Sequence, residues 1–175
     1  GVICISQSVA QSFHRWATQK YPTETYHRSI DWFHLGADLG NSMPTTGLPS
    51  DAETVLQRIR SAASFLMVGT LEPRKGHTQV LEAFERLWSQ GAPCQLVLVG
   101  RAGWRVEALL ERLRQHPRRQ TQLFWLESIS DEYLEKIYAA STCLIAASYG
   151  EGFGLPLIEA AQHKLPIMAR DIPVF

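Results

Sequence analysis

Four charged side chains are the residues of this chain best suited to chemistry. Arg74 and Lys75 stand side by side in the loop TLEPRKG, and Glu151 and Glu159 enclose a glycine-rich segment. A forked guanidinium and a compact ammonium can neutralise a diphosphate from two directions. Taken alone, such a basic pair is more often solvated, so its interpretation depends on what lies beside it.

The glycine-rich segment has the features of an anion site. GEGFGLP places three glycines around an acid, directly before a helix that we expect to begin near Pro156. Free N–H groups and the helix dipole attract anions at such a terminus, and glycine permits close backbone approach. A tight strand-to-helix turn with ordinary capping is the alternative, because a glycine-rich turn by itself is a weak signal.

The two glutamates need separate explanations. Glu159 is expected in the first helical turn, where it would compensate the helix dipole or accept hydrogen bonds from a ribose. Glu151 interrupts an apolar, glycine-rich loop, and an ionised acid there requires partners that sugar hydroxyls could supply. A glycosidase pair of carboxylates is the competing hypothesis. It is disfavoured because a leaving diphosphate needs no protonation and because the adjoining features suit an anion.

Other chemistries are disfavoured by the sequence. His77, His116 and His163 lack metal-ligand spacing and the chain has no Asp-x-Asp, so we expect no metal site. The segment GRAG at 100–103 lacks the full G-x-G-x-x-G fingerprint, which disfavours a nicotinamide enzyme. Seventeen Lys and Arg balance seventeen Asp and Glu, which excludes a general nucleic-acid binder.

The composition indicates a folded protein of a reducing compartment. The chain has 175 residues, of which 45% are hydrophobic, and no apolar run approaches the roughly 18 to 20 residues of a membrane span. Its three cysteines lie in apolar settings, which favours a cytoplasmic protein without a disulfide framework. Residues 101–119 are rich in arginine, and a solvated helix face is favoured there over contact with an anionic membrane surface.

Apolar runs alternate with helical patterns along the chain, which predicts an α/β fold with a Rossmann-like parallel sheet and helices on both faces. Ser130 should cap one helix, and Ser50 with Glu53 should form a capping box for another. The predicted strands are residues 2–6, 64–69, 95–100, 122–126, 142–147 and 165–169, with a further candidate at 30–35. The predicted helices are residues 8–21, 50–60, 77–90 and 104–116, with two more beginning near 130 and 156.

The order of these elements predicts where the charged residues meet. Ligands of open parallel sheets bind beyond the carboxyl ends of the strands. The loops after the strands at 64–69 and 142–147 should therefore open on one edge of the sheet. We divide the chain into the end of an amino-terminal domain at 1–21, a linker at 22–50 and the main domain at 51–175, and interpret it as a piece of a longer protein.

Four segments carry a resemblance: FLMVGTLEPRKGH, QLVLVG, SDEYLEKIYAAS and EGFGLPLIEA. In order and spacing they resemble the carboxyl-terminal, nucleotide-sugar-binding domain of the family 4 retaining glycosyltransferases of the GT-B type, over residues 64–173. The combination is more specific than any single motif. WLESISDEYL, LIAASYGEGFGLPLIEAAQHKLPI and HLGADL are similar to bacterial mannosyltransferases that build lipopolysaccharide O-antigen.

The resemblance implies a role for each site residue, in a retaining transfer that needs no metal. Arg74 and Lys75 would contact the donor diphosphate, Glu151 would face the donor sugar, and Glu159 would hold the ribose. Backbone groups around the sugar would come from Gly152, Phe153, Gly154 and Leu155. The base would lie against the segment from Leu126 to Ile129, where Glu127-Ser128 stands in place of the glycine that the family often has.

The implied function is mannosyl transfer from GDP-mannose in O-antigen synthesis, in the cytoplasm, with peripheral contact at the inner membrane surface as a further expectation. The acceptor would be a growing or lipid-linked glycan bound by an amino-terminal domain, so this chain alone should bind nucleotide and transfer nothing. Two alternatives stay open: a non-transferring relative such as a nucleotide-sugar epimerase, and a degenerate domain that binds a partner protein. The intact set of Arg74, Lys75, Glu151 and Glu159 disfavours the second.

Overall fold

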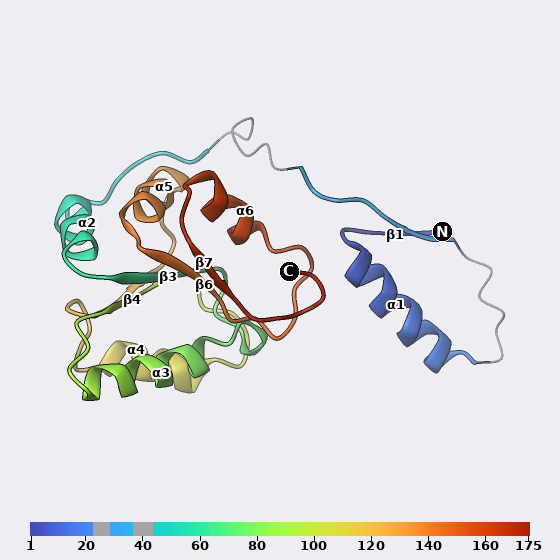
Figure 1. Cartoon of the computed structure of the whole chain (residues 1–175), viewed down its shortest axis with the longest axis horizontal. Helices are drawn as coiled ribbons and strands as arrows, with labels where there is room; N and C mark the ends of the chain where they lie inside the picture. The colour runs from blue at the N-terminus through green and yellow to red at the C-terminus, as the bar shows by residue number, and fades with distance from the viewer. Residues whose placement is uncertain (23–28, 37–43) are drawn as a thin grey trace.

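The computed structural model describes residues 1–22, 29–36 and 44–175, and these form two parallel sheets (Figure 1). The larger sheet has the strand order β5-β4-β3-β6-β7, and a smaller one pairs β1 with β2. The α/β fold class predicted from the sequence is confirmed. The strands are β1 (Val2–Cys4), β2 (Ile30–Trp32), β3 (Ser64–Val68), β4 (Gln95–Val99), β5 (Leu123–Leu126), β6 (Cys143–Ala146) and β7 (Ile167–Ala169).

Helices cover both faces of the larger sheet, as the alternation of apolar runs predicts. In Figure 1, α2, α5 and α6 lie above the sheet and α3 and α4 lie below it. The helices are α1 (Gln7–Lys20), α2 (Ala52–Arg60), α3 (His77–Ser89), α4 (Glu107–Gln115), α5 (Asp131–Ala140) and α6 (Leu155–Gln162). Among the described residues, none of these helices combines the length and the apolar character needed to span a membrane.

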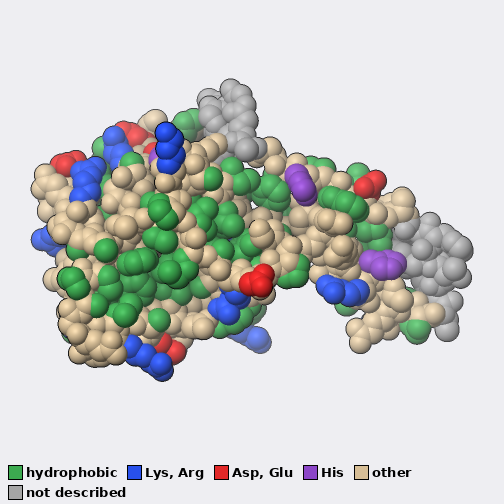
Figure 2. Space-filling view, viewed as in Figure 1, with side chains coloured by type: hydrophobic (Ala, Val, Ile, Leu, Met, Phe, Trp, Pro, Cys, Tyr) green, Lys and Arg blue, Asp and Glu red, His purple; other side chains and the backbone are tan. Residues whose placement is uncertain are grey.

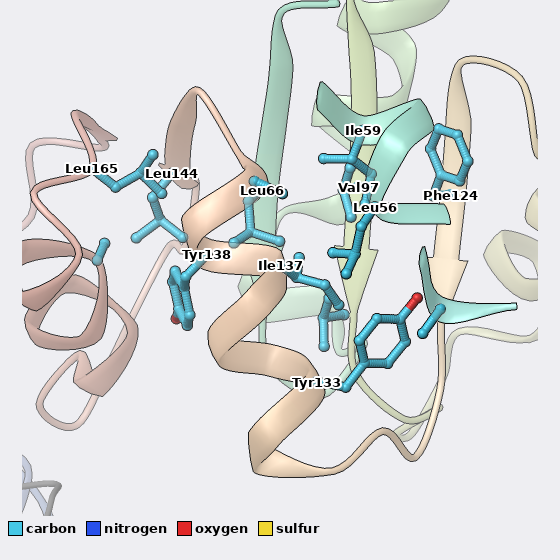
Figure 3. Close-up of a cluster of buried hydrophobic side chains, with 14 residues drawn as sticks. Leu56, Ile59, Leu66, Val97, Phe124, Tyr133, Ile137, Tyr138, Leu144 and Leu165 are labelled. Carbon is cyan, nitrogen blue, oxygen red and sulfur yellow. The ribbon is translucent and has the colours of Figure 1, made fainter. Parts of the chain in front are cut away.

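The central strand β4 is buried on both sides, and its successive side chains point to opposite faces of the sheet. In β4, Val97 packs with the helices above the sheet, whereas Leu96 and Leu98 pack with the helices below it. Figure 3 shows the upper cluster, in which Leu66 lies near Ile137 of α5. Each fully buried aliphatic side chain contributes about 1.5–3 kcal/mol. Both clusters are built from residues 52–165, so the main domain has its own core.

Two helix starts differ from the prediction. The capping box of Ser50 and Glu53 is wrong, because α2 begins at Ala52 after a turn in which the Ala52 N–H bonds the Pro49 carbonyl at 3.0 Å. Helix α4 was expected from about residue 104 but begins at Glu107. The reason is Arg105, whose left-handed backbone (φ 52°) interrupts the helical conformation.

One large apolar side chain of α3 is exposed. Leu87 of α3 is 41% exposed, whereas Phe84 and Trp88 of the same helix are buried. Leu87 faces an apolar groove of about 440 Å³ between α3, β6 and β7, which Met168 also lines. Figure 2 shows hydrophobic side chains gathered over this part of the molecule.

The amino-terminal part forms a β1-α1-β2 unit beside the main domain (Figure 1). Strand β2 lies within the stretch 22–50 that was interpreted as a linker, and its partner is β1. Residues 23–28 and 37–43 of the predicted linker, and with them part of the HLGADL segment, lie outside the described residues.

The last part of that stretch is bound to the amino end of α5. The Thr45 N–H and hydroxyl both donate to Asp131 Oδ2, at 2.8 and 2.7 Å, and the Asp131 N–H donates to the Thr45 hydroxyl at 2.9 Å. Ser130 caps α5 as predicted, because its hydroxyl accepts the Tyr133 N–H at 3.1 Å. These contacts fix where the chain enters the main domain.

Candidate functional site

Two loops meet at the carboxyl edge of the larger sheet, after the neighbouring strands β3 and β6. The Tyr149 N–H donates to the Arg74 carbonyl at 2.7 Å, which ties the loops together backbone to backbone. Gly76 makes this approach possible, since its backbone is left-handed (φ 76°) and a Cβ there would lie 2.5 Å from the Ala147 carbonyl oxygen. The loops therefore converge as the sequence predicts.

Glu151 is the centre of an ion-pair network at this junction. Its Oε2 accepts a hydrogen bond from Arg74 Nη1 at 3.0 Å, and its Oε1 contacts Lys75 Nζ and accepts the Ser148 hydroxyl at 2.6 Å. Arg74 also donates through Nε to Glu72 Oε2 at 2.8 Å. The sequence predicted that Glu151 needs partners, and in the free chain two cations and a hydroxyl supply them.

Burial and charge act in opposite directions on these groups. Burial alone would raise the pKa of the Glu151 carboxyl, but hydrogen bonds from Lys75, Ser148 and Arg74 and the positive charge of Lys75 outweigh it and lower the pKa. The side chains of Glu151 and Lys75 are 9% and 13% exposed, while that of Arg74 is 44% exposed. Arg74 is thus the cation of the network most accessible to a ligand.

His77 lies beneath this network, at the first residue of α3. It is 2% exposed, and neither ring nitrogen has a hydrogen-bond partner among the described residues. Burial, together with the nearby charge of Lys75, lowers the pKa of His77 to about 4. His77 is therefore neutral in the folded protein at neutral pH. In the sequence, His77 stands out only as a possible metal ligand, and no local signal indicates its place under the site.

Glu159 occupies a different position from the predicted one. Helix α6 begins at Leu155, so Glu159 is its fifth residue and lies beyond the first turn. Compensation of the dipole by an acid in that turn is therefore wrong. Glu159 Oε2 accepts a hydrogen bond from the Tyr138 hydroxyl at 2.6 Å, and Tyr138 in turn stacks on His163 with ring centroids 5.2 Å apart. Burial, followed by the charge of Glu159, raises the pKa of Tyr138.

The amino end of α6 has no side-chain cap. Gly154 is the N-cap residue, with a left-handed backbone (φ 96°) and no side chain of its own, and the Leu157 N–H donates to the Gly154 carbonyl at 3.0 Å. Pro156 carries no N–H itself, and its fixed φ suits the first turn. The positive end of the helix dipole therefore faces the junction of the two loops.

A cavity of about 480 Å³ unites these groups. It gathers most of the predicted site residues, and Ile5 and Leu35 from the amino-terminal part also line it. The predicted residues on its wall are Arg74, Lys75, Glu151, Gly152, Phe153, Gly154, Leu155 and Glu159. A bond of 2.7 Å from the Ser6 hydroxyl to the Gly152 carbonyl holds the amino-terminal part against the glycine-rich loop. No local sequence signal pointed to Ile5 or Leu35.

Leu126 and Ile129 are placed elsewhere. Both are half-buried and pack against the hydrophobic cluster above the sheet, away from the wall of the cavity. Between them Ser128 adopts a left-handed backbone (φ 52°), the conformation that glycine favours. The loop thus keeps this backbone geometry without the glycine, and the base contact stays a prediction.

Two further predictions can be compared with the structure. All three cysteines are free thiols, in agreement with the expected lack of a disulfide framework. Within the described residues, no group of three or more His, Cys, Asp or Glu side chains could hold a metal ion. Transfer without a metal stays a prediction.

The chain is similar to glycosyltransferases in sequence. The family model described as glycosyl transferases group 1 matches residues 56–175. A serotype-specific mannosyltransferase, WbdA of Escherichia coli, is 52% identical over 99% of this chain and 22% of its own length. The O-antigen chain mannosyltransferase B of Escherichia coli is 32% identical over 71% of this chain and 33% of its own. The chain thus spans about a fifth of the length of WbdA.

Solved structures share the fold. HepE of Anabaena, in complex with UDP and glucose, has a TM-score of 0.66 at 19% identity, over 99% of this chain and 45% of that one. The catalytic domain of starch synthase IV from Arabidopsis thaliana, bound to ADP and acarbose, has a TM-score of 0.69 at 18% identity, over 99% and 40%. With the family model covering more than half of the sequence, the chain belongs to the group 1 glycosyl transferases.

Proposed function

We propose that this chain is the donor-binding part of a retaining mannosyltransferase that uses GDP-mannose to build a cell-surface polysaccharide. The observation that carries the proposal is the convergence of Arg74, Lys75 and the uncapped amino end of α6 on one cavity. Two cations and a helix dipole suit a diphosphate. The similarity to WbdA, named a mannosyltransferase, supports mannose as the sugar.

The proposed chemistry follows from where charge develops. When the bond between the sugar and the diphosphate breaks, negative charge accumulates on the departing phosphate oxygens. Arg74, Lys75 and the α6 dipole would stabilise that charge without a metal. Glu151 would face the sugar. Glu159 Oε2 already holds Tyr138, which would leave Oε1 to accept a ribose hydroxyl.

The proposal also covers the acceptor, the base of the donor and the place of action. The acceptor would be a glycan or lipid-linked glycan bound by a further domain, and the base would lie near residues 126–129. Because nucleotide sugars would be used before export of the product, the proposed place of action is the cytoplasm, with contact at the inner membrane surface.

Calorimetric titration with GDP, UDP, ADP and GDP-mannose tests the donor site. We expect selective binding of GDP and GDP-mannose, with the affinity for GDP lowered about 10- to 100-fold in Arg74→Ala, since hydrogen bonds between charged groups are lost. Glu159→Ala should also lower the affinity for GDP. Arg86→Ala, an exposed arginine on α3, is the matched control and should bind as the unaltered chain does.

The other outcomes are informative. Selective binding of UDP would support the diphosphate site but would indicate a UDP-sugar as the donor in place of GDP-mannose. Binding of no nucleoside diphosphate, or equal affinity in Arg74→Ala, would contradict the proposal.

A further inference from the structure

A second polar cluster lies behind the glycine-rich loop and is centred on Arg170, the residue that follows β7. The Arg170 guanidinium carbon lies 4.1 Å from the centre of the Tyr149 ring. Arg170 Nε donates to the Ala147 carbonyl at 3.0 Å, and Arg170 Nη2 bonds Gln79 Oε1. The Tyr149 hydroxyl donates to the same Gln79 oxygen at 3.0 Å. The cluster therefore joins β7, the glycine-rich loop and α3.

This cluster is connected to the proposed diphosphate site through one residue. Tyr149 receives Arg170 on its ring, and its backbone N–H donates to the Arg74 carbonyl at 2.7 Å. Glu151 follows two residues later and pairs with Arg74 and Lys75. A shift of Tyr149 would therefore move both ends of the ion-pair network.

The loop itself has little stiffness of its own. Glycines at positions 150, 152 and 154 leave its backbone many accessible conformations, so its geometry must be imposed from outside. Arg170 is well placed to do this, since its backbone N–H donates to the Ala146 carbonyl at 2.9 Å and extends the ladder between β6 and β7. A planar guanidinium on a strand end is a rigid support for a flexible loop.

The partners of the Arg170 side chain are neutral groups, which indicates that Arg170 orients its neighbours and does not neutralise a carboxylate. Within the part of the chain that the structure describes, its side chain contacts a carbonyl, an amide oxygen and an aromatic face, and no ion pair to a carboxylate is formed. A cation held by neutral groups fixes their geometry through directed donors and stacking. A lysine could not reproduce both the fork and the stack.

We infer that Arg170 is a positioning residue, which acts through Tyr149 to hold Arg74 at the place where it would receive a diphosphate. This inference rests on the proposed function for the ligand, but the arrangement it describes exists in the free protein. Its test therefore has one measurement without ligand and one with ligand.

The measurement without ligand is the ¹⁵Nε signal of Arg74 in NMR spectra, assigned with Arg74→Lys. In the unaltered chain the signal should show the slow exchange and shift of a guanidinium paired with Glu72 and Glu151. In Arg170→Ala we expect the signal to broaden or move toward that of a free arginine, while the control Arg86→Ala leaves it in place. An unchanged Arg74 signal in Arg170→Ala would overturn the inference, whether or not any nucleotide binds.

The measurement with ligand compares GDP with GMP by calorimetry. Arg170→Ala and Arg170→Lys should lower the affinity for GDP about 10-fold and the affinity for GMP less than about twofold, since binding of the β-phosphate depends on the positioned cations. Tyr149→Phe keeps the ring under Arg170 and should stay within about twofold of the unaltered chain, whereas Tyr149→Ala should resemble Arg170→Ala.

The outcomes separate two failures. If the unaltered chain binds no nucleoside diphosphate, the proposed function fails, and the Arg74 signal alone decides the inference. If the unaltered chain binds GDP and Arg170→Ala binds it equally well, or loses GDP and GMP alike together with its thermal stability, Arg170 has no positioning role and the inference fails while the proposed function stands.

Discussion

The Glu151 carboxylate receives donors from both loops of the site and so bridges them. Arg74 and Lys75 come from the loop after β3, while Ser148 comes from the same loop as Glu151 itself. Because a buried charge requires partners, removing one member of such a network leaves the others unpaired. The effect of replacing Glu151 can therefore be separated into stability and affinity.

We expect Glu151→Gln to lower the free energy of unfolding by about 2 kcal/mol at neutral pH, because Lys75 would lose its counter-charge. GDP should bind as tightly as before or more tightly, since the carboxylate no longer competes for the two cations. Urea unfolding and calorimetry measure the two effects. Glu53→Gln, at an exposed ion pair of 3.4 Å with Arg60, is the control and should change neither. A large loss of GDP affinity in Glu151→Gln would contradict this expectation.

His77 predicts a pH dependence of stability. Its pKa is lowered from 6.5 to about 4 in the folded protein, so the unfolded chain takes up the proton first as pH falls. The contribution to stability is complete above pH 6.5 and is lost as pH falls toward about 4. Between pH 7 and pH 5 this amounts to about 2 kcal/mol.

Urea unfolding at pH 7 and at pH 5 measures that loss. His77→Gln should show a correspondingly smaller difference between the two pH values, whereas the exposed His14→Gln should keep the difference of the unaltered chain. Equal pH dependence in all three proteins would exclude His77 as its source.

Among the elements, the contact between residue 45 and α5 can be tested most directly. Thr45→Val removes the hydroxyl that donates to Asp131 Oδ2 and accepts the Asp131 N–H, so we expect a loss of about 1 kcal/mol and a fall in Tm of about 2–4 °C. The backbone N–H of Thr45 and then its hydroxyl hold the pKa of Asp131 below its ordinary value, and NMR titration should show this pKa rising in Thr45→Val. Thr46→Val is the matched control; an equal loss there would refute the role of the hydroxyl.

Elements defined by local chemistry were predictable from the sequence. Ser130 caps α5 because its hydroxyl can accept an otherwise unbonded N–H of the first turn, and the central strands are short apolar runs of the kind found in buried parallel sheets. The starts of α2 and α4 were not, because they depend on a turn at Pro49 and on a left-handed Arg105. Such backbone choices are decided by tertiary contacts and leave little trace in residue type.

The site likewise has residues that the sequence predicts and residues that only tertiary contacts reveal. Arg74, Lys75 and Glu151 were predictable because their loops follow strands, and parallel strands bring such loops to one edge. Arg170, Ser6 and Ile5 were not, because their contacts depend on β7 lying beside β6 and on the amino-terminal part reaching the glycine-rich loop. Neither neighbourhood can be read from spacing along the chain.

At the scale of the whole molecule, the core and the cavity differ in what the amino-terminal part contributes to them. The buried clusters come from residues 52–165, whereas the cavity is also lined by Ile5 and Leu35. We therefore expect residues 44–175 to fold alone, with a single cooperative transition and a near-ultraviolet circular dichroism spectrum like that of the full chain. GDP should bind more weakly, as one wall is lost. A non-cooperative transition would show that the β1-α1-β2 unit is needed for the fold.

The ion pairs of the site would also influence which anions it admits. Arg74 and Lys75 are paired with Glu72 and Glu151, so the four charges sum to zero. A bound anion would replace a carboxylate as the partner of the cations, because the site carries no excess positive charge. Under the proposed function, inorganic phosphate or sulfate would have to displace a tethered carboxylate, whose effective concentration is high. A nucleotide would bring further contacts through its ribose and base. We therefore expect selectivity against small anions and a weak dependence of nucleotide affinity on salt.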